Sequence, residues 1–391
     1  MKVTNVEIFD INTVVPTWHP VILRVHTDEG ISGLGEAGLA YGAGHAAAVG
    51  MIRNLVESYL IGADPFASEK IWETMFRSSF WGLGGGPVVF GGMSAIDIAL
   101  WDIKGKALGL PVYQLLGGKT NDRLRTYASQ IQFGWGKERV MLSRPEEYAE
   151  AALQAVAEGY DCVKLDPLVI DRNGKPIWSG RLGLLNPEQV REYRNRVKAV
   201  RDAVGPDVDI ILDLHALLSP ATAAQLAEAW ADLDCLYYEE PVNSLNADLQ
   251  GVVARSVKVP MAAGERIYTR WGYRKYFELN SLAVIQPDLA LVGGLTEGKK
   301  ICDLAHIYDV TVQCHVCGSP VATVAALHLE TAIPNFLIHE HHTNSIKRFN
   351  TELCVPDYQP KKGYFEAPNL PGLGIELNDA VVGTSPCLRI P

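Results

Sequence analysis

The chain has 391 residues, a formal net charge of −10 and 20% charged residues. This length fits a β/α barrel of about 250 residues together with a smaller domain. The acidic balance, without a basic stripe, argues against a nucleic-acid partner. No run reaches the roughly 18 uncharged apolar residues that cross a bilayer, and the first residues lack the apolar stretch of a signal peptide. We therefore expect a cytoplasmic protein that binds neither nucleic acid nor a membrane.

Residues 1–120 are expected to form an α+β domain. Alternating apolar and polar residues predict strands over Val3–Asn12 and Val21–Asp28, and the glycines of residues 30–38 indicate a turn into a third strand. Helical spacing of apolar residues follows over Ala46–Ile61, Ser68–Arg77 and Gly92–Leu108.

Residues 121–345 follow a different rhythm, in which short apolar, β-branched runs end in a polar residue and precede segments with helical spacing. The expected strands are 125–129, 161–166, 207–215, 236–240, 259–265, 282–288, 310–316 and 336–340. Such alternation implies parallel strands joined by right-handed crossovers, and eight strands favour a closed barrel. No clear helix follows the last strand. We predict an α/β fold, a modified (β/α)8 TIM barrel of the (β/α)7β type, with residues 346–391 returning to the first domain.

Three carboxylates close neighbouring barrel strands. Asp213, Glu239 and Glu265 follow one another at a spacing of about one β/α unit, so we expect them at similar height around the barrel mouth. Carboxylates held that close repel one another unless a cation neutralises them. An all-oxygen ligand set favours Mg²⁺ or Mn²⁺ over zinc. The sequence therefore predicts a divalent metal site.

Further titratable residues end the other strands. His215 lies two residues beyond Asp213 and is expected beside it, as Lys164 is beside Asp166. Asp288 and His315 end adjacent strands and are expected to form an Asp–His pair, in which the carboxylate fixes the tautomer of the ring. Two histidines would then face each other across the mouth. Glu340 ends the last strand, where it either donates a hydrogen bond in protonated form or pairs with His339 or His341.

Several motifs together carry a resemblance that spans nearly the whole chain. They are SAIDIALWDIKGKALGLPVYQLLGG (94–118), KLD (164–166), DLH (213–215), YYEEP (237–241), GER (264–266), IQPD (285–288), CH (314–315) and HE (339–340). This set resembles the enolase superfamily and, within it, the mandelate racemase-like acid-sugar dehydratases. The resemblance implies that the first domain caps the barrel, with loops near residues 17–20, 41–45 and 81–87 closing over the substrate. It also implies a homo-oligomer.

The resemblance assigns a role to each candidate site residue. Asp213, Glu239 and Glu265 match the ligands of one Mg²⁺ per subunit, which Mn²⁺ could replace. Asp288 and His315 match a base dyad, Glu340 matches an electrophilic carboxyl, and Lys164 remains as a cation near the substrate carboxylate. Racemase relatives carry a second lysine where this chain has Asp166, whose role stays open. His215 serves that face instead, which resembles dehydratases of galactonate, mannonate and similar aldonates.

The function that follows is a hydro-lyase that removes the α-proton of a sugar acid and expels the 3-hydroxyl, giving a 2-keto-3-deoxy acid. We take His315 as base and His215 as acid, and the reverse assignment stays open. A racemase or epimerase acting on the same site is one alternative, and a catalytically inactive regulatory or binding protein is another. Galactonate, mannonate and gluconate all remain candidate substrates, read by the capping loops and by residues 167–185.

Overall fold

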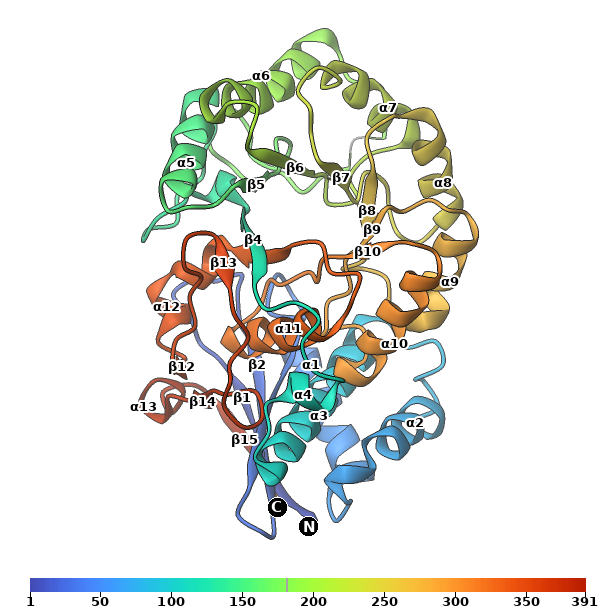
Figure 1. Ribbon diagram of the computed structural model, residues 1–391, viewed down its shortest axis with the longest axis vertical. Helices are drawn as coiled ribbons and strands as arrows, with labels where there is room; N and C mark the ends of the chain where they lie inside the picture. Colours follow the sequence, from blue (N-terminus) through green and yellow to red (C-terminus); the bar gives the residue numbers. More distant parts are fainter. Residues whose placement is uncertain (181) are drawn as a thin grey trace.

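The computed structural model describes residues 1–180 and 182–391, and its barrel and first domain stack along the long axis of the molecule (Figure 1). Arg181 lies outside the described residues, within the segment 167–185 that sequence analysis connects with substrate recognition. No helix in the described part of the chain is long and apolar enough to cross a bilayer.

The first domain contains an antiparallel sheet that both ends of the chain build. Its strands in order are β15 (Cys387–Ile390), β1 (Val3–Asp10), β2 (Val21–Thr27) and β3 (Ser32–Ala37). Val6 pairs with Ile390, so the final strand returns to the first one, as expected for the C-terminal segment. The two termini accordingly lie close together at one end of the molecule (Figure 1).

Helices cover one face of this sheet. They are α1 (His45–Leu55), a π-helical turn at Val56–Leu60, a 3-10 turn at Pro65–Ala67, α2 (Ser68–Ser78), α3 (Pro87–Leu108) and α4 (Val112–Leu115). The glycines near residue 33 do more than mark a turn. A Cβ at Gly33 would lie 2.2 Å from the Ala99 carbonyl oxygen, and one at Gly35 would lie 1.8 Å from that of Ala95. Glycine is therefore required inside β3 so that α3 can lie directly on it.

The second part is a parallel barrel, which confirms the predicted fold class. Within the described residues its eight strands are β4 (Leu124–Ser129), β5 (Cys162–Leu165), β6 (Asp209–Asp213), β7 (Tyr237–Glu239), β8 (Met261–Ala263), β9 (Val284–Ile285), β10 (Thr311–Val312) and β11 (His339–His342). β11 pairs with β4, and the ring closes where Val312 N donates to Asn335 O at 2.8 Å and Leu337 N donates to Val312 O at 2.9 Å. β11 begins three positions later than the predicted strand 336–340.

In the described part of the chain, a helix of at least 10 residues follows each barrel strand except the last, and together these helices form the outer layer (Figure 1). They are α5 (Pro145–Ala157), α6 (Pro187–Val204), α7 (Pro220–Ala229), α8 (Ala247–Ser256), α9 (Thr269–Glu278), α10 (Gly294–Ile307) and α11 (Pro320–Ala332). α6, α7 and α11 each begin with proline, which fits the first turn because its missing N–H is not needed there. The side chains of Asn186, Ser219 and Ser319 cap these three helices.

Short elements complete the chain. They are 3-10 turns at Ile131–Phe133 and Thr343–Ile346, α12 (Arg348–Thr351), β12 (Cys354–Val355), β13 (Tyr364–Phe365), β14 (Glu376–Leu377) and α13 (Asp379–Val382). β13 pairs antiparallel with β4, and β12 pairs with β14. β11 is thus followed by turns and a single-turn helix rather than by a full crossover helix, as the (β/α)7β prediction requires.

Buried carboxylates join the first domain to the barrel. Glu36, in β3, accepts hydrogen bonds from Ser319 N at 2.9 Å and Ala322 N at 3.0 Å at the start of α11. Asp97, in α3, accepts from Thr296 N at 2.8 Å at the start of α10. Both helix starts follow the carboxyl ends of barrel strands, so these contacts fix the first domain over the barrel mouth. The motif 94–118 therefore includes residues that hold the two domains together.

Candidate active site

The three predicted metal ligands meet at the mouth of the barrel. Asp213 and Glu239 are register partners at the ends of β6 and β7, and Glu265 follows the end of β8. Each offers one carboxylate oxygen, and these oxygens lie within 4.8 Å of one another. The side chains of Asp213 and Glu239 are 1% and 0% exposed, while that of Glu265 is 11% exposed and reaches the cavity. The spacing in the sequence thus does place the carboxylates together.

The three carboxylates at the barrel mouth are crowded together with too little positive charge around them. Burial, followed by the charge of Asp213, raises the pKa of Glu239 to about 8. Burial also disfavours ionised Asp213, but His215 and Lys164 outweigh it, and the pKa of Asp213 is lowered. The pKa of Glu265 is lowered in the same way, against burial, by Arg266 and His315. Crowded oxygens with too little positive charge fit a hard divalent cation.

Lys164 supplies positive charge from within the barrel. Its Nζ lies 2.9 Å from Glu239 Oε1, 2.7 Å from Glu340 Oε1 and 3.3 Å from Asp213 Oδ2, and its side chain is 0% exposed. Burial lowers its pKa, but these carboxylates outweigh burial and hold the pKa well above the ordinary value. Lys164 therefore faces the protein's own carboxylates rather than the open cavity.

His215 pairs with Asp166, the residue whose role the sequence left open. Its Nδ1 donates to Asp166 Oδ2 at 2.5 Å, and its backbone N donates to Asp213 Oδ1 at 3.2 Å. Asp166 is fixed by Leu168 N at 2.5 Å and Val169 N at 3.1 Å. Burial lowers the pKa of His215, but Asp213 and Asp166 raise it to about 9. Because Nδ1 carries the proton given to Asp166, Nε2 is the ring atom left for chemistry.

His315 forms the predicted pair with Asp288. Its Nδ1 donates to Asp288 Oδ2 at 2.8 Å, and its Nε2 lies 3.1 Å from Glu265 Oε2. Burial lowers the pKa of His315, but Glu265 and the hydrogen bond to Asp288 outweigh it and raise the pKa to about 10. Two histidine–aspartate pairs thus flank the carboxylates, one beyond β6 and one beyond β10.

Glu340 lies beneath the same cluster. Its Oε1 accepts from Ser129 Oγ at 2.5 Å, and its Oε2 accepts from Val316 N at 2.9 Å. Burial raises its pKa, but Lys164 and His315 outweigh burial and the pKa is lowered. The alternative that Glu340 pairs with a neighbouring histidine is wrong, because His339 binds Glu330 at 2.6 Å and His341 binds Tyr160 at 2.7 Å.

A cavity of 550 Å³ opens above these groups, between the two domains. His215, Glu265 and His315 line it from the barrel. Thr17, Leu39, Tyr41, Gly42 and Pro87 line it from the first domain. Residues of all three predicted loops, 17–20, 41–45 and 81–87, therefore contribute to the cavity. Trp178, from the segment 167–185, makes edge-to-face ring contacts with His215 and Tyr41. The ring centroids are 5.2 Å and 6.0 Å apart, respectively.

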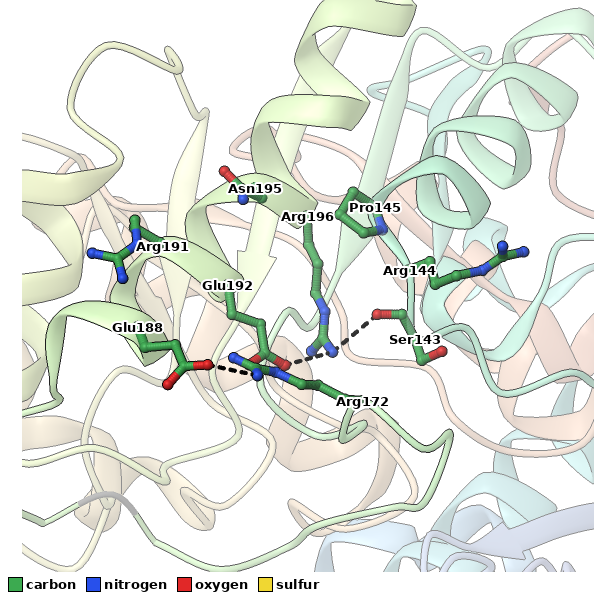
Figure 2. Close-up of a pocket in the computed structure, with 9 residues that line it drawn as sticks. All are labelled: Ser143, Arg144, Pro145, Arg172, Glu188, Arg191, Glu192, Asn195 and Arg196. Carbon is green, nitrogen blue, oxygen red and sulfur yellow. Dashed lines mark hydrogen bonds and ion pairs between the residues drawn. The ribbon is translucent and has the colours of Figure 1, made fainter.

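A second cavity of 370 Å³ lies away from the mouth, between the starts of α5 and α6 (Figure 2). Arginines line it, and acidic neighbours pair with Arg144, Arg172 and Arg196. Arg172 binds Glu188 and Glu192, each at 2.7 Å, and Arg196 binds Glu192 at 3.1 Å. None of the candidate site residues lines this cavity. Its charges therefore serve local structure, and the chemistry lies at the barrel mouth.

Sequence reasoning missed polar residues that also contact the cluster. Gln130, directly after β4, donates to Asp213 Oδ2 at 2.6 Å, and Gln132 donates to Gln130. Arg266 binds both Glu240 and Glu265. The signal was available, because Gln130 follows its strand as the other site residues follow theirs. Because Gln130 carries no charge, the spacing of titratable side chains does not single it out.

A parallel barrel with carboxylates and paired histidines at its mouth is typical of metal-assisted enzymes that transfer protons to and from carbon. Comparison with known families agrees. "Mandelate racemase / muconate lactonizing enzyme, N-terminal domain" matches residues 9–117, and "Enolase C-terminal domain-like" matches residues 147–381. The chain therefore belongs to the enolase superfamily, in its mandelate racemase/muconate lactonizing enzyme branch.

Individual relatives cover essentially the whole chain. A D-galactonate dehydratase of Verminephrobacter eiseniae is 35% identical over 98% of this chain and 94% of its own length. One of Ralstonia nicotianae is 33% identical, with the same coverage. A member of the enolase superfamily from Salmonella Typhimurium has a crystal structure that superposes with a TM-score of 0.97, at 51% identity and covering 100% of both chains.

Proposed function

We propose that this protein is a divalent-metal-dependent hydro-lyase that dehydrates a sugar acid to a 2-keto-3-deoxy acid. The substrate class is a hexonate such as galactonate, mannonate or gluconate. The observation that carries the proposal is the placement of Asp213, Glu239 and Glu265 between two histidine–aspartate pairs at one cavity. The D-galactonate dehydratases at 33–35% identity support the same reaction class. We further propose a cytoplasmic homo-oligomer, which size-exclusion chromatography with light scattering would test.

Asp213, Glu239 and Glu265 would hold one Mg²⁺, with Mn²⁺ as a substitute. Their oxygen-only set and the raised pKa of Glu239 suit a hard cation. When bound, the ion supplies positive charge for the carboxylate of the substrate as negative charge develops on it. Lys164, paired with Glu239 and Glu340, holds those side chains in place and lowers the cost of burying them together.

The two histidines divide the proton transfers between them. His315 Nε2, made basic by Asp288, removes the proton on the carbon next to the substrate carboxylate. His215 then gives its Nε2 proton to the 3-hydroxyl, which departs as water with the electrons of its C–O bond. The C–H electrons form the C2–C3 double bond of an enol, and this enol becomes the 2-keto acid. A substrate of opposite configuration at C2 would present its proton to His215 and exchange the two roles.

Racemisation or epimerisation is the second candidate, because it also needs two bases on opposite faces of one carbon. It is favoured by the matching Nδ1–carboxylate bonds of His215 and His315. Dehydration ranks higher because Asp166 stands where racemases of the family keep a lysine base. A binding protein without activity is the remaining alternative.

The test is a screen of hexonates, starting with D-galactonate, for 2-keto acid formation in Mg²⁺ and in D₂O. We expect His315→Asn to lower turnover by about 10²- to 10⁴-fold and to stop exchange of the α-proton. His215→Asn should form little 2-keto acid but still exchange that proton. Exchange with inversion and no 2-keto acid in the native protein would favour racemisation. Binding of a hexonate without any exchange or conversion would favour the inactive protein.

A further inference from the structure

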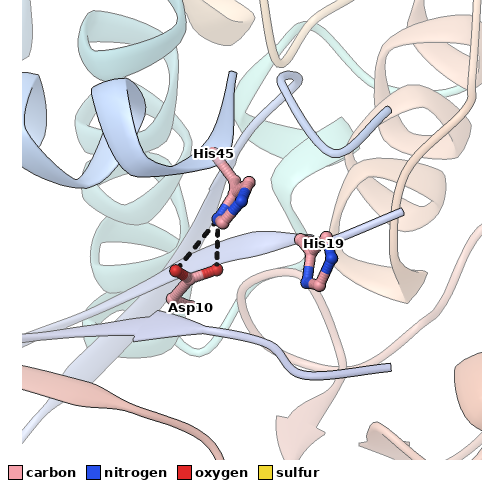
Figure 3. Close-up of side chains that lie close together, drawn as sticks. All are labelled: Asp10, His19 and His45. Carbon is pink, nitrogen blue, oxygen red and sulfur yellow. Dashed lines mark hydrogen bonds and ion pairs between the residues drawn. The ribbon is translucent and has the colours of Figure 1, made fainter. Parts of the chain in front are cut away.

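A second cluster of metal-ligating side chains lies in the first domain. Asp10 ends β1, His19 lies in the loop before β2, and His45 begins α1 (Figure 3). Each offers one ligand atom, and these atoms lie within 4.8 Å of one another. His45 Nδ1 is 2.9 Å and 3.0 Å from the two Asp10 carboxylate oxygens. The imidazole rings of His19 and His45 stack with centroids 4.5 Å apart.

The backbone already orients His19 as a ligand. Its Nε2 lies 3.1 Å from the carbonyl oxygen of Pro16, and because a carbonyl only accepts, Nε2 must donate. In the neutral ring Nδ1 is then the unprotonated nitrogen. A histidine that donates its other N–H to a backbone carbonyl is the usual arrangement around metal-bound imidazoles. His45 Nδ1 and the Asp10 carboxylate already face each other, so an ion between them would replace their hydrogen bond.

We propose that Asp10, His19 and His45 bind a divalent transition ion of the zinc type. Two imidazoles and one carboxylate suit zinc better than the oxygen-only set at the barrel mouth, which suits magnesium. Zinc–ligand distances of about 2.0–2.2 Å require the three atoms to draw together. The side chains of Asp10 and His45 are 25% and 31% exposed, so rotation about side-chain bonds can achieve this, and water can fill the fourth position.

The ion would join segments that reach the substrate cavity. The loop with His19 and the loop before His45 pair through their backbones, since His19 N donates to Ala40 O at 2.7 Å and Gly42 N donates to Thr17 O at 2.9 Å. Thr17, Tyr41 and Gly42 line the 550 Å³ cavity. Zinc held at the base of both loops would therefore fix their positions. This inference does not rest on the proposed hydro-lyase activity.

The experiment titrates the purified full-length protein with Zn²⁺ in excess Mg²⁺, against a chromophoric chelator. We expect the native protein to bind one equivalent of zinc. His19→Gln and Asp10→Asn should each lower the zinc affinity by more than about 10-fold. His26→Gln is the matched control, because His26 lies in the same sheet, is 31% exposed like His45 and also pairs with a carboxylate, Glu7, at 3.1 Å. It should bind zinc as the native protein does. Glu239→Gln should also retain the equivalent, which separates this site from the barrel mouth.

A second readout does not depend on stoichiometry. Zinc should slow amide hydrogen exchange in residues 13–20 and 38–44 of the native protein and of His26→Gln, but not of His19→Gln. Melting of each variant without zinc, at the native temperature, establishes that it folds. Zinc binding that survives in His19→Gln and Asp10→Asn, or that disappears only in Glu239→Gln, would overturn the proposal. So would the absence of any zinc equivalent in the native protein.

Discussion

Two regions of the molecule bury carboxylates in different surroundings. At the junction of the domains, Asp102 accepts from Leu34 N at 2.9 Å and from Leu373 N at 2.7 Å, and Glu36 and Asp97 are also met by backbone N–H groups. At the barrel mouth, Glu239 faces Asp213 and is met by Lys164 Nζ at 2.9 Å and 3.0 Å.

The difference separates acids that join two segments of the chain from acids that repel one another. A carboxylate that accepts backbone hydrogen bonds fixes the two segments that it joins, and its removal leaves buried donors unsatisfied. A carboxylate that faces other carboxylates adds repulsion to the fold and retains a need for a cation. Both kinds are buried and acidic, so burial alone does not distinguish them. Substitutions in the two regions should therefore have opposite effects on activity and stability.

The largest effect is expected from Glu239→Gln. We expect dehydration to fall by about 10³-fold or more, because the ion and the charge that it supplies are weakened. The melting temperature should stay close to the native value, because the amide oxygen can still accept a hydrogen bond from Lys164 while the repulsion with Asp213 is lost. Turnover with saturating Mg²⁺, together with thermal melting, measures both. A variant that keeps native turnover without metal would refute the carboxylate site, and one that loses activity only by unfolding would refute the contrast between the regions.

The barrel and the three carboxylates at its mouth could be predicted because strand periodicity sets where each parallel strand ends, and those ends meet at one mouth. The hydrogen bond between His215 and Asp166 could not be predicted in this way. β6 ends at Asp213, and His215 lies beyond it at φ 44°, a left-handed conformation that strand alternation does not describe. The bond also requires side chains from two neighbouring strands to meet. The need for glycine at positions 33 and 35 is hidden from the sequence for a similar reason, because it comes from contact with α3, far away in the chain.

A moderate effect, on stability and not on turnover, is expected from Asp97→Ala at the domain junction. Thr296 N and Thr296 Oγ1, at 2.8 Å and 2.6 Å, would lose their acceptor in a buried position. The variant should lose about 1–3 kcal/mol of stability, while turnover per folded molecule stays native. Urea unfolding and active-fraction assays test this. Asp97→Asn, which keeps one accepting oxygen, should lose less, and equal losses in both variants would mean that packing rather than hydrogen bonding matters here.

The last effect is a pH dependence of stability at the same junction. Burial, partly offset by the Thr296 hydrogen bonds, raises the pKa of Asp97 to about 7, above the value of about 3.9 expected in the unfolded chain. The folded protein therefore holds this proton more tightly. The resulting stabilisation is complete below pH of about 4 and is lost as the pH rises through about 7. Asp97→Asn carries no such proton, so the melting temperature of the native protein should fall relative to that of Asp97→Asn between pH 5 and 8. A constant difference over that range would mean that Asp97 is ionised throughout, with the Thr296 donors outweighing burial.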